Sequence, residues 1–349
     1  MRCPAALFCL LALTGCQTGY YLHLAGGHSR LMLDREPVER VLAEARLSDE
    51  LAQRLALTPE MLDFAEHELA LPVGRAYRRF VHLQRDWVVW NLVAAPEFSL
   101  EPHRWCYPIA GCNSYRGYYN LKRAERDAER LRERGLQVYG GGAVAYSTLG
   151  WFADPLTTPM LVGDETWIAE LLFHELAHRR FWLRGDTAFN ESLATSVGRE
   201  GLRRWLVARD EADLITRMHE RDRARAQVLR MVNDIRDALE QLYASDMPEA
   251  TMRERRDQLI AELRQGFAQA RSEDQALARY QRWFDGPLNN AQLATFNDYN
   301  QWVPAFDQLL LECAGHWACF WQQVERLAAF DPEPRRAALE QLHDRTGSL

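Results

Sequence analysis

The pentapeptide His174-Glu175-Leu176-Ala177-His178 is the sequence feature that most constrains the fold of this chain. Its two histidines are four residues apart in an apolar stretch, which predicts one turn of α-helix between them and both imidazoles on one face. Two imidazoles placed in this way can bind one zinc ion, and the glutamate beside them can activate water. The motif therefore predicts a metal-binding helix, and the first hypothesis for function is a zinc metallopeptidase.

A catalytic zinc ion needs a third protein ligand and an open position for water. The compact motif with a third histidine is excluded, because position 184 is arginine. We expect Gly185 to end the zinc helix and residues 186–189 to form a short turn, after which a second helix begins at Asn190 and returns beside the first. Glu191 is then the expected third ligand.

Two other carboxylates, Glu200 and Asp186, stay open as alternative ligands. The spacing of Glu200 from His178 is closer to that of the best-known peptidases with two histidines and one glutamate. Arginines at positions 199, 203 and 204 nevertheless make a solvated ion pair the simpler interpretation of Glu200. Asp186 is better suited to cap a helix or to accept a hydrogen bond from a ligand histidine.

The chemistry of this centre requires a base and an oxyanion donor. Glu175 is the expected general base, which takes a proton from zinc-bound water and later passes it to the leaving amine. Besides zinc, a side-chain donor must stabilise the oxyanion of the tetrahedral intermediate. Tyr146, Tyr299 and His316 are the candidates, and the sequence does not rank them.

The patterns along the chain predict a mainly α fold with a small β-sheet, of the α+β class. Apolar residues spaced by three and four predict several packed helices from Pro37 to Ala95. Residues 105–119, which are aromatic and rich in glycine, predict an irregular loop, and a charged helix should run from Leu121 to Arg134. Small and β-branched residues at 138–150 predict a strand, which could bind the backbone of a substrate, and 151–159 should be a loop.

A long charged segment predicts a helical hairpin. Residues 202–284 are nearly free of glycine and are interrupted near 245–248, as expected for two long antiparallel helices. Their facing apolar positions should be Leu229, Val232, Ile235, Leu239 and Leu242 against Met252, Leu259, Leu263 and Phe267. We expect residues 16–201 to form a scaffold with the zinc site, 202–284 a hairpin able to hold a partner protein, and 285–349 a helical part packed on the catalytic domain.

The N-terminus predicts a lipid anchor. An arginine and the apolar run Pro4–Leu13 are typical of a secretory signal, too short to span a bilayer. Leu13-Thr14-Gly15-Cys16 resembles the bacterial lipobox, so residues 1–15 should be the signal and Cys16 the lipidated residue; an ordinary signal with a chance cysteine is the alternative. Because residue 17 is glutamine and not aspartate, we expect the lipid to anchor the protein in the outer membrane, facing the periplasm.

Four cysteines remain beyond Cys16 in two equally spaced pairs, Cys106 with Cys112 and Cys313 with Cys319. In an oxidising compartment they predict disulfides, although three pairings are open. A four-cysteine zinc site is the alternative, but its usual spacing of two to four residues is shorter than the spacing found. The net charge of −7, without an uninterrupted basic block, argues against nucleic acid as a partner.

Several stretches together resemble a known family. They are residues 105–108 (WCYP), 110–112 (AGC), 115–118 (YRGY), 145–152 (AYSTLGWF), 173–178 (FHELAH), 185–187 (GDT), 189–192 (FNES), 289–291 (NNA) and 299–300 (YN). The sequence is similar to bacterial lipoproteins described as zinc-dependent aminopeptidases of gluzincin type. The resemblance implies a zincin-like core, zinc, peptide hydrolysis and the Asn190-Glu191 pair as the source of the third ligand. Two positions depart from that pattern, with Tyr107 and Leu193 where phenylalanine is expected, and neither is a proposed ligand.

Other functions stay open. An aminopeptidase needs a group that holds the substrate amine, and nothing singles out one of four acidic residues near the motif, Asp154, Asp164, Glu165 and Glu170. The same zinc chemistry could hydrolyse cell-wall stem peptides or other amides. A lipid-anchored scaffold or chaperone with a structural zinc ion is the alternative from another class, although no fourth cysteine or histidine ligand is evident near the motif.

Overall fold

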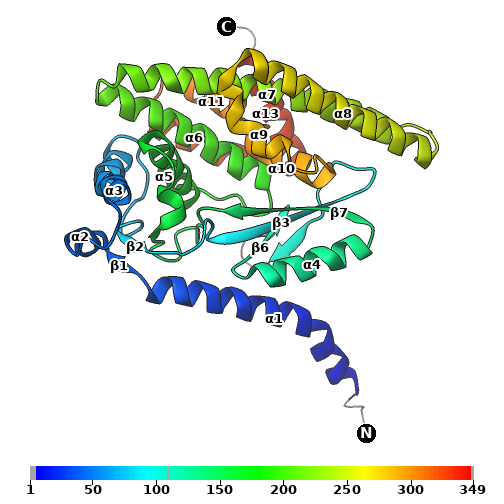
Figure 1. Ribbon diagram of the computed structural model, residues 1–349, viewed down its shortest axis with the longest axis horizontal. Helices are drawn as coiled ribbons and strands as arrows, with labels where there is room; N and C mark the ends of the chain where they lie inside the picture. Colours follow the sequence, from blue (N-terminus) through cyan, green and yellow to red (C-terminus); the bar gives the residue numbers. More distant parts are fainter. Residues whose placement is uncertain (1–4, 108–110, 347–349) are drawn as a thin grey trace.

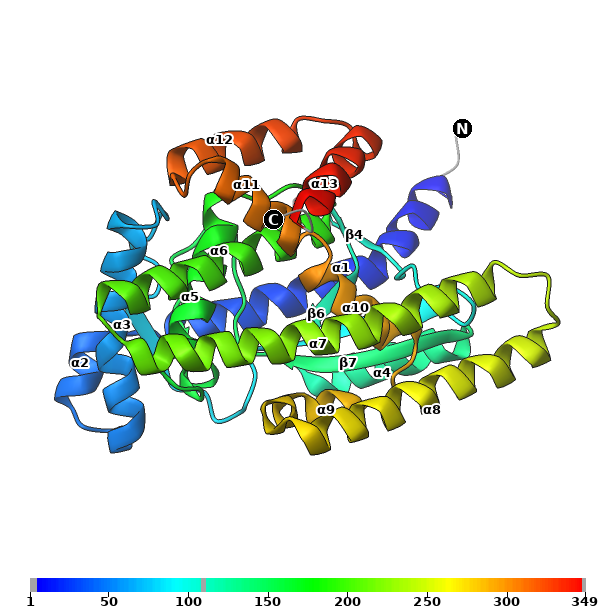
Figure 2. The ribbon, with the colours of Figure 1, turned by 90° about the horizontal axis from the view of Figure 1, so that it is seen from above.

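The computed structural model describes residues 5–107 and 111–346, with side chains from Thr18 onward except those of residues 297, 298 and 346. Helices make up most of these residues and short strands form small sheets, which confirms the mainly α fold with a small β-sheet. Figures 1 and 2 show the sheet with helices on both of its faces and a long helical hairpin along one side. In the described part of the chain, no helix has an apolar stretch long enough to cross a membrane.

A three-stranded antiparallel sheet in the order β6-β3-β7 lies at the centre (Figure 1). β3 (Val89–Pro96) pairs along its whole length with the edge strand β7 (Leu136–Ala143), and on its other side with β6 (Tyr115–Tyr118). One face of β3 packs against α4 (Leu121–Glu133), and the other packs against α10 (Asn290–Asn300). β3 is therefore buried on both faces.

This burial explains one wrong prediction. Helices were expected throughout 37–95, and the structure has them only as α2 (Val38–Ala43) and α3 (Asp49–His67). The short β1 (Glu36–Pro37) and β2 (Arg79–Val81) pair with each other, and β3 follows. A strand that is buried on both faces has a continuous apolar run instead of an alternating one, so its period does not distinguish it from a buried helix.

Two other predictions about strands need correction. The expected loop at 105–119 contains β6 and a hairpin of β4 (Trp105–Tyr107) and β5 (Gly111–Asn113). Residues 108–110, between β4 and β5, lie outside the described part. The strand expected at 138–150 ends at Ala143, because Ala143 pairs with Val89, the first residue of β3, and no partner strand continues beyond it among the described residues. Further along, Thr148 donates hydrogen bonds to the carboxylate of Asp154. β8 (Leu156–Thr157) and a 3₁₀ turn, η1 (Thr158–Leu161), occupy the expected loop at 151–159.

The core is built on two antiparallel helices, α5 (Glu165–Arg180) and α6 (Thr187–Ala208). Glycine permits their close approach, since a Cβ at Gly198 would lie 2.8 Å from the carbonyl oxygen of Glu170. α3 packs against α5 through the aromatic contact of Phe64 with Phe173. The prediction that Gly185 ends the zinc helix is wrong, because α5 ends at Arg180 and the chain is extended at the next residue.

The long hairpin consists of α7 (Ala212–Tyr243) and α8 (Glu249–Glu273), which lie side by side in Figures 1 and 2. All but two of the predicted apolar positions belong to the buried residues of its core. Ile235 is only partly buried, and Leu229 lies outside this core, where its neighbour Val228 is fully buried instead. Two short elements, η2 (Gln275–Tyr280) and α9 (Gln281–Phe284), pack beside the hairpin.

The C-terminal helices complete the core beside α6. They are α11 (Val303–Glu312), α12 (Trp317–Ala328) and α13 (Pro332–Thr346). The structure pairs Cys313 with Cys319, which joins the end of α11 to α12, and pairs Cys106 with Cys112 across the β4-β5 hairpin. Both disulfides are local, so each pair of like-spaced cysteines closes its own loop.

The N-terminal helix α1 (Ala5–Leu33) runs beneath β6 and α4 (Figure 1). It is fixed there by the Tyr20 hydroxyl, which donates a hydrogen bond to the carbonyl of Gly117 at 2.9 Å, and by burial of Leu31. Cys16, the predicted lipidation site, lies in the part of α1 whose side chains are not described.

Candidate metal centre

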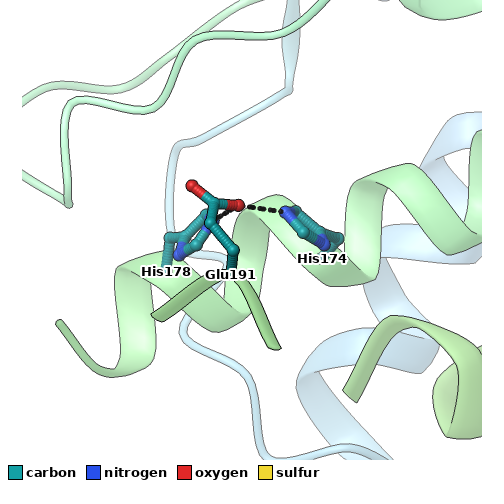
Figure 3. A group of neighbouring side chains, drawn as sticks. All are labelled: His174, His178 and Glu191. Carbon is teal, nitrogen blue, oxygen red and sulfur yellow. Dashed lines mark ion pairs between the residues drawn. The ribbon is translucent and has the colours of Figure 1, made fainter. Parts of the chain in front are cut away.

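Two histidines and a glutamate converge between α5 and α6 (Figure 3). One carboxylate oxygen of Glu191 lies 3.3 Å from Nε2 of His174 and 3.4 Å from Nε2 of His178. The ligand atoms of the three side chains are all within 4.8 Å of one another. The structure thus brings together the three residues that the sequence predicted as ligands.

The turn between the two helices aims Glu191 at the histidines. Asn190, the residue before it, accepts a hydrogen bond from the backbone N–H of Leu183 and donates one to the Leu183 carbonyl, both at 2.7 Å. Asp186 caps α6 by accepting a hydrogen bond from the Phe189 N–H at 3.1 Å. Its second oxygen forms an ion pair with the nearly buried Arg335 at 3.1 Å, so Asp186 acts as a cap and not as a ligand.

The disulfide-bonded β4-β5 hairpin supports this turn from outside. Arg104 donates hydrogen bonds to the carbonyls of Cys112 and Gly185, which joins the hairpin to the turn. The two backbones touch, because a Cβ at Gly111 would lie 2.7 Å from the backbone nitrogen of Gly185. The sequence predicted the disulfide candidates without placing them near the metal helix.

The donor set suits a divalent metal ion. Glu191 is 3% exposed, and although burial alone would raise its pKa, the imidazoles of His178 and His174 lower that pKa to about 2. Glu191 is therefore an anion that faces two imidazole nitrogens, which is the ligand set of catalytic zinc sites with one carboxylate. The residues present thus fit a zinc ion, and other metals that accept nitrogen and oxygen ligands fit the same set.

Glu175 lies beside the ligands and is 8% exposed. Burial raises its pKa to about 7; His174 opposes this rise, whereas the carboxylates of Glu191 and Asp154 add to it. A carboxyl group with a pKa close to neutrality can both accept and release a proton, as a general base must.

The face of α5 that carries Glu175 meets two loops. Arg179, one turn further along, donates hydrogen bonds to the carbonyls of Pro72 at 3.3 Å and Phe152 at 2.9 Å. Tyr77 ties the two loops together, since its N–H donates to the carbonyl of Asp154 at 2.7 Å. The loops at 72–77 and 152–154 therefore cover this face of the metal helix.

Tyr77 is a residue that sequence reasoning missed. Its ring is 2% exposed, its backbone is left-handed with φ of 57°, and its hydroxyl has no hydrogen-bond partner within the described residues. Burial raises its pKa, and the carboxylates of Glu175 and Asp154 raise it further. No motif surrounds Tyr77 in the sequence, so only the packing of the loops could identify it.

The structure separates the three candidate oxyanion donors. The ring of Tyr299, on α10, stacks on His174 with the ring centroids 6.2 Å apart. Tyr146 follows β7 and packs against Tyr119, with the ring centroids 6.0 Å apart. His316 lies at the start of α12 beside Gly315, whose carbonyl binds Arg204 of α6. Since Arg204 is about 20 Å along α6 from Glu191, His316 does not join the metal cluster.

The remaining acidic candidates have other partners. Glu200 forms ion pairs with Arg203 at 2.6 Å and Arg204 at 2.7 Å, as its sequence context suggested. Asp164 caps α5 by accepting a hydrogen bond from the Trp167 N–H at 2.9 Å. Glu170 forms an ion pair with Arg221 of α7 at 2.5 Å.

Comparison with known proteins gives one family. Residues 19–339 match a family whose description reads "Putative aminopeptidase". No curated protein and no solved structure matches the chain. The match covers nearly all of the described residues.

Proposed function

The chain belongs to this aminopeptidase family, and from that premise we propose that it is a zinc-dependent peptidase of the bacterial periplasm, with cleavage at the amino end of peptides. One observation carries the proposal: the donor atoms of His174, His178 and Glu191 lie within 4.8 Å of one another, with Glu175 next to His174 on the same helix. The direction of cleavage rests on the family alone.

His174, His178 and Glu191 would hold the ion. A bound zinc ion supplies Lewis acidity, which lowers the pKa of water and polarises the carbonyl of the scissile bond. Glu175 accepts the proton of the attacking water and delivers it to the leaving amine, and its raised pKa suits both steps. Tyr299 is the candidate donor to the oxyanion, because among the three candidates it is the one that stacks on a ligand.

The substrate would bind as an added strand. β7 is an edge strand with three consecutive glycines, which permit close approach of another backbone. The chain beyond β7 continues into the loop that contacts α5 through Arg179 and Phe152. This connection supports a path from the strand edge to the metal centre.

We also propose the location and the anchor. The matched region begins at residue 19, three residues after Cys16, so the apolar segment and the lipobox lie outside it. This position supports a lipid on Cys16 and attachment of the catalytic domain to the outer membrane, facing the periplasm. A zincin-like core likewise stays a prediction.

The test is the Glu175→Gln variant, assayed for release of amino-terminal residues from a peptide library after reconstitution with zinc. The variant keeps its zinc and its fold and loses turnover by about 100-fold or more, because proton transfer is removed. Glu200→Gln is the matched control and keeps full activity, since Glu200 is held by arginines. Undiminished turnover of Glu175→Gln would refute the mechanism.

A further inference from the structure

The outward face of α1 carries large apolar side chains among small and polar ones such as Ser29. A helix on a protein surface normally presents polar side chains to solvent. On α1, however, Leu22 is 69% exposed and Leu33 is 82% exposed, and Tyr21 is exposed beside Leu22. Arg30 is the single charged residue between positions 5 and 33. The opposite side of the helix is already used, because Tyr20 and Leu31 are buried against the domain.

A second exposed apolar group adjoins this helix. Trp151 is 70% exposed and Phe152 is 53% exposed, on the loop that follows β7. The ring of Phe152 contacts that of His28 on α1, with the centroids 4.8 Å apart. α1 and this loop together carry six of the twelve large apolar side chains that are exposed in the described chain: Tyr21, Leu22, Leu33, Tyr146, Trp151 and Phe152. We call these six residues the α1 surface.

Cations lie at the C-terminal end of α1. Arg30 is exposed on its last turn, and Arg79 of β2 is in register with Pro37, four residues after the helix ends. Arg75 is exposed in the segment before β2. The acidic residues of the same stretch are Asp34 and Glu39, which are exposed, and Glu36, which forms an ion pair with Arg46 at 2.6 Å. Aromatic and aliphatic side chains bordered by arginine are typical of surfaces that lie in the headgroup region of an anionic bilayer.

From these observations we propose that the α1 surface docks on the surface of an anionic phospholipid membrane, with α1 parallel to the bilayer plane. The proposal goes beyond peptide hydrolysis and does not depend on it. The position of the predicted anchor agrees with this orientation. Tyr20, which is fixed beneath the sheet, is only four positions after Cys16, so a lipid at Cys16 holds this end of α1 within about 15 Å of the bilayer.

The docked orientation places the metal centre close to the membrane. The Phe152 carbonyl accepts a hydrogen bond from Arg179, the residue after His178, and the Phe152 ring belongs to the α1 surface. The loop at 146–152 therefore contacts both the metal helix and the lipid. This arrangement would favour peptides held at the membrane over peptides free in solution.

The test measures contact between Trp151 and lipid. The full chain, as made in a bacterial envelope, is reconstituted on vesicles of POPE and POPG whose acyl chains carry bromine, a quencher of tryptophan fluorescence. We expect quenching in the wild type and loss of most of it in Trp151→Phe. Trp283→Phe, on α9 at the hairpin, is the matched control and keeps the quenching of the wild type. Trp151 is mostly exposed, so its replacement leaves the fold intact.

Two results would overturn the proposal. Equal quenching in the wild type and in Trp151→Phe, while the protein stays on the vesicles, would show that Trp151 does not contact lipid and that the domain is attached without docking of the α1 surface. Hydrogen-exchange protection of residues 18–33 that grows with protein concentration, without quenching, would show that a second copy covers the α1 surface. Replacing POPG with POPC removes the negative charge of the vesicles, and we expect weaker quenching of the wild type on these neutral vesicles. In Arg75→Gln and Arg79→Gln, quenching should differ less between the anionic and the neutral vesicles.

Discussion

Asn190→Ala is the substitution that most directly tests how the fold aims its third ligand. Asn190 is 1% exposed, and its amide makes two hydrogen bonds of 2.7 Å to the backbone of Leu183. Alanine removes both bonds and keeps the helical backbone of α6. The turn between α5 and α6 then loses its contact with Asn190, which lies in the first turn of α6 directly before Glu191.

The magnitude follows from the two lost bonds. Each contributes about 1 kcal/mol net, and an unpaired buried group costs about 1–3 kcal/mol more. Leu183 is half-buried, so water can reach part of its backbone, and the expected loss of stability is about 2–3 kcal/mol. Because Asn190 orients a ligand, zinc affinity should also fall by about tenfold or more.

Urea unfolding of the zinc-free protein and competition with a zinc chelator measure the two effects separately. Asn120→Ala is the matched control, because Asn120 caps α4 by accepting a hydrogen bond from the Arg123 N–H at 3.0 Å. This variant should lose about 1 kcal/mol and keep its zinc affinity. If Asn190→Ala is no less stable than Asn120→Ala and binds zinc as the wild type does, the reasoning is refuted.

Three other predictions concern the packing around the site and the hairpin. Gly198→Ala should destabilise the protein by about 1–3 kcal/mol, because the added Cβ would lie 2.8 Å from a backbone carbonyl oxygen. Gly266→Ala on α8 has room for a Cβ and should stabilise the protein by up to about 1 kcal/mol. Thermal unfolding of both variants measures the difference, and equal effects would contradict the prediction. Tyr77→Phe removes a hydroxyl without a partner among the described residues, so its unfolding free energy should stay the same or rise by up to about 1 kcal/mol, and a fall would show a hidden partner. Hydrogen bonding to Arg253 lowers the pKa of Glu97 below its ordinary 4.5, so this stabilisation is complete above pH 4.5 and is lost in acid. In Glu97→Gln, the unfolding free energy should therefore fall less steeply below pH 4.5 than in the wild type, by a small amount because solvent screens this ion pair. An unchanged slope would contradict this role of Glu97.

Local patterns in the sequence predicted the parts of the fold that depend on few residues. The hairpin of α7 and α8 follows from a 3.6-residue period over a long segment, and α4 ends before Gly135, which has φ of 78°. The double-sided burial of β3 depends on α4 and α10, which are distant in sequence, so its period misled the prediction. The end of β7 at Ala143 depends on where its partner strand β3 begins, and the residues of 138–150 do not indicate that position.

The same division applies to the candidate site. His174, Glu175 and His178 are within one helical turn, so spacing alone places them together. Glu191 could be predicted as a ligand because a short connection after the first helix lets the second helix return beside it. Tyr77 and Tyr299 reach the site through the packing of remote segments, and the sequence has no local signal for that packing.

The zinc content of the purified chain tests the central claim most directly. Elemental mass spectrometry of the wild type, the His174→Ala variant and the His219→Ala control, all after reconstitution and dialysis, gives the number of ions per chain. We expect about one zinc ion per chain in the wild type and in the control, whose histidine is exposed on α7, and none in His174→Ala. An absence of zinc from the wild type, or its persistence in His174→Ala, would show that these residues do not form a zinc site.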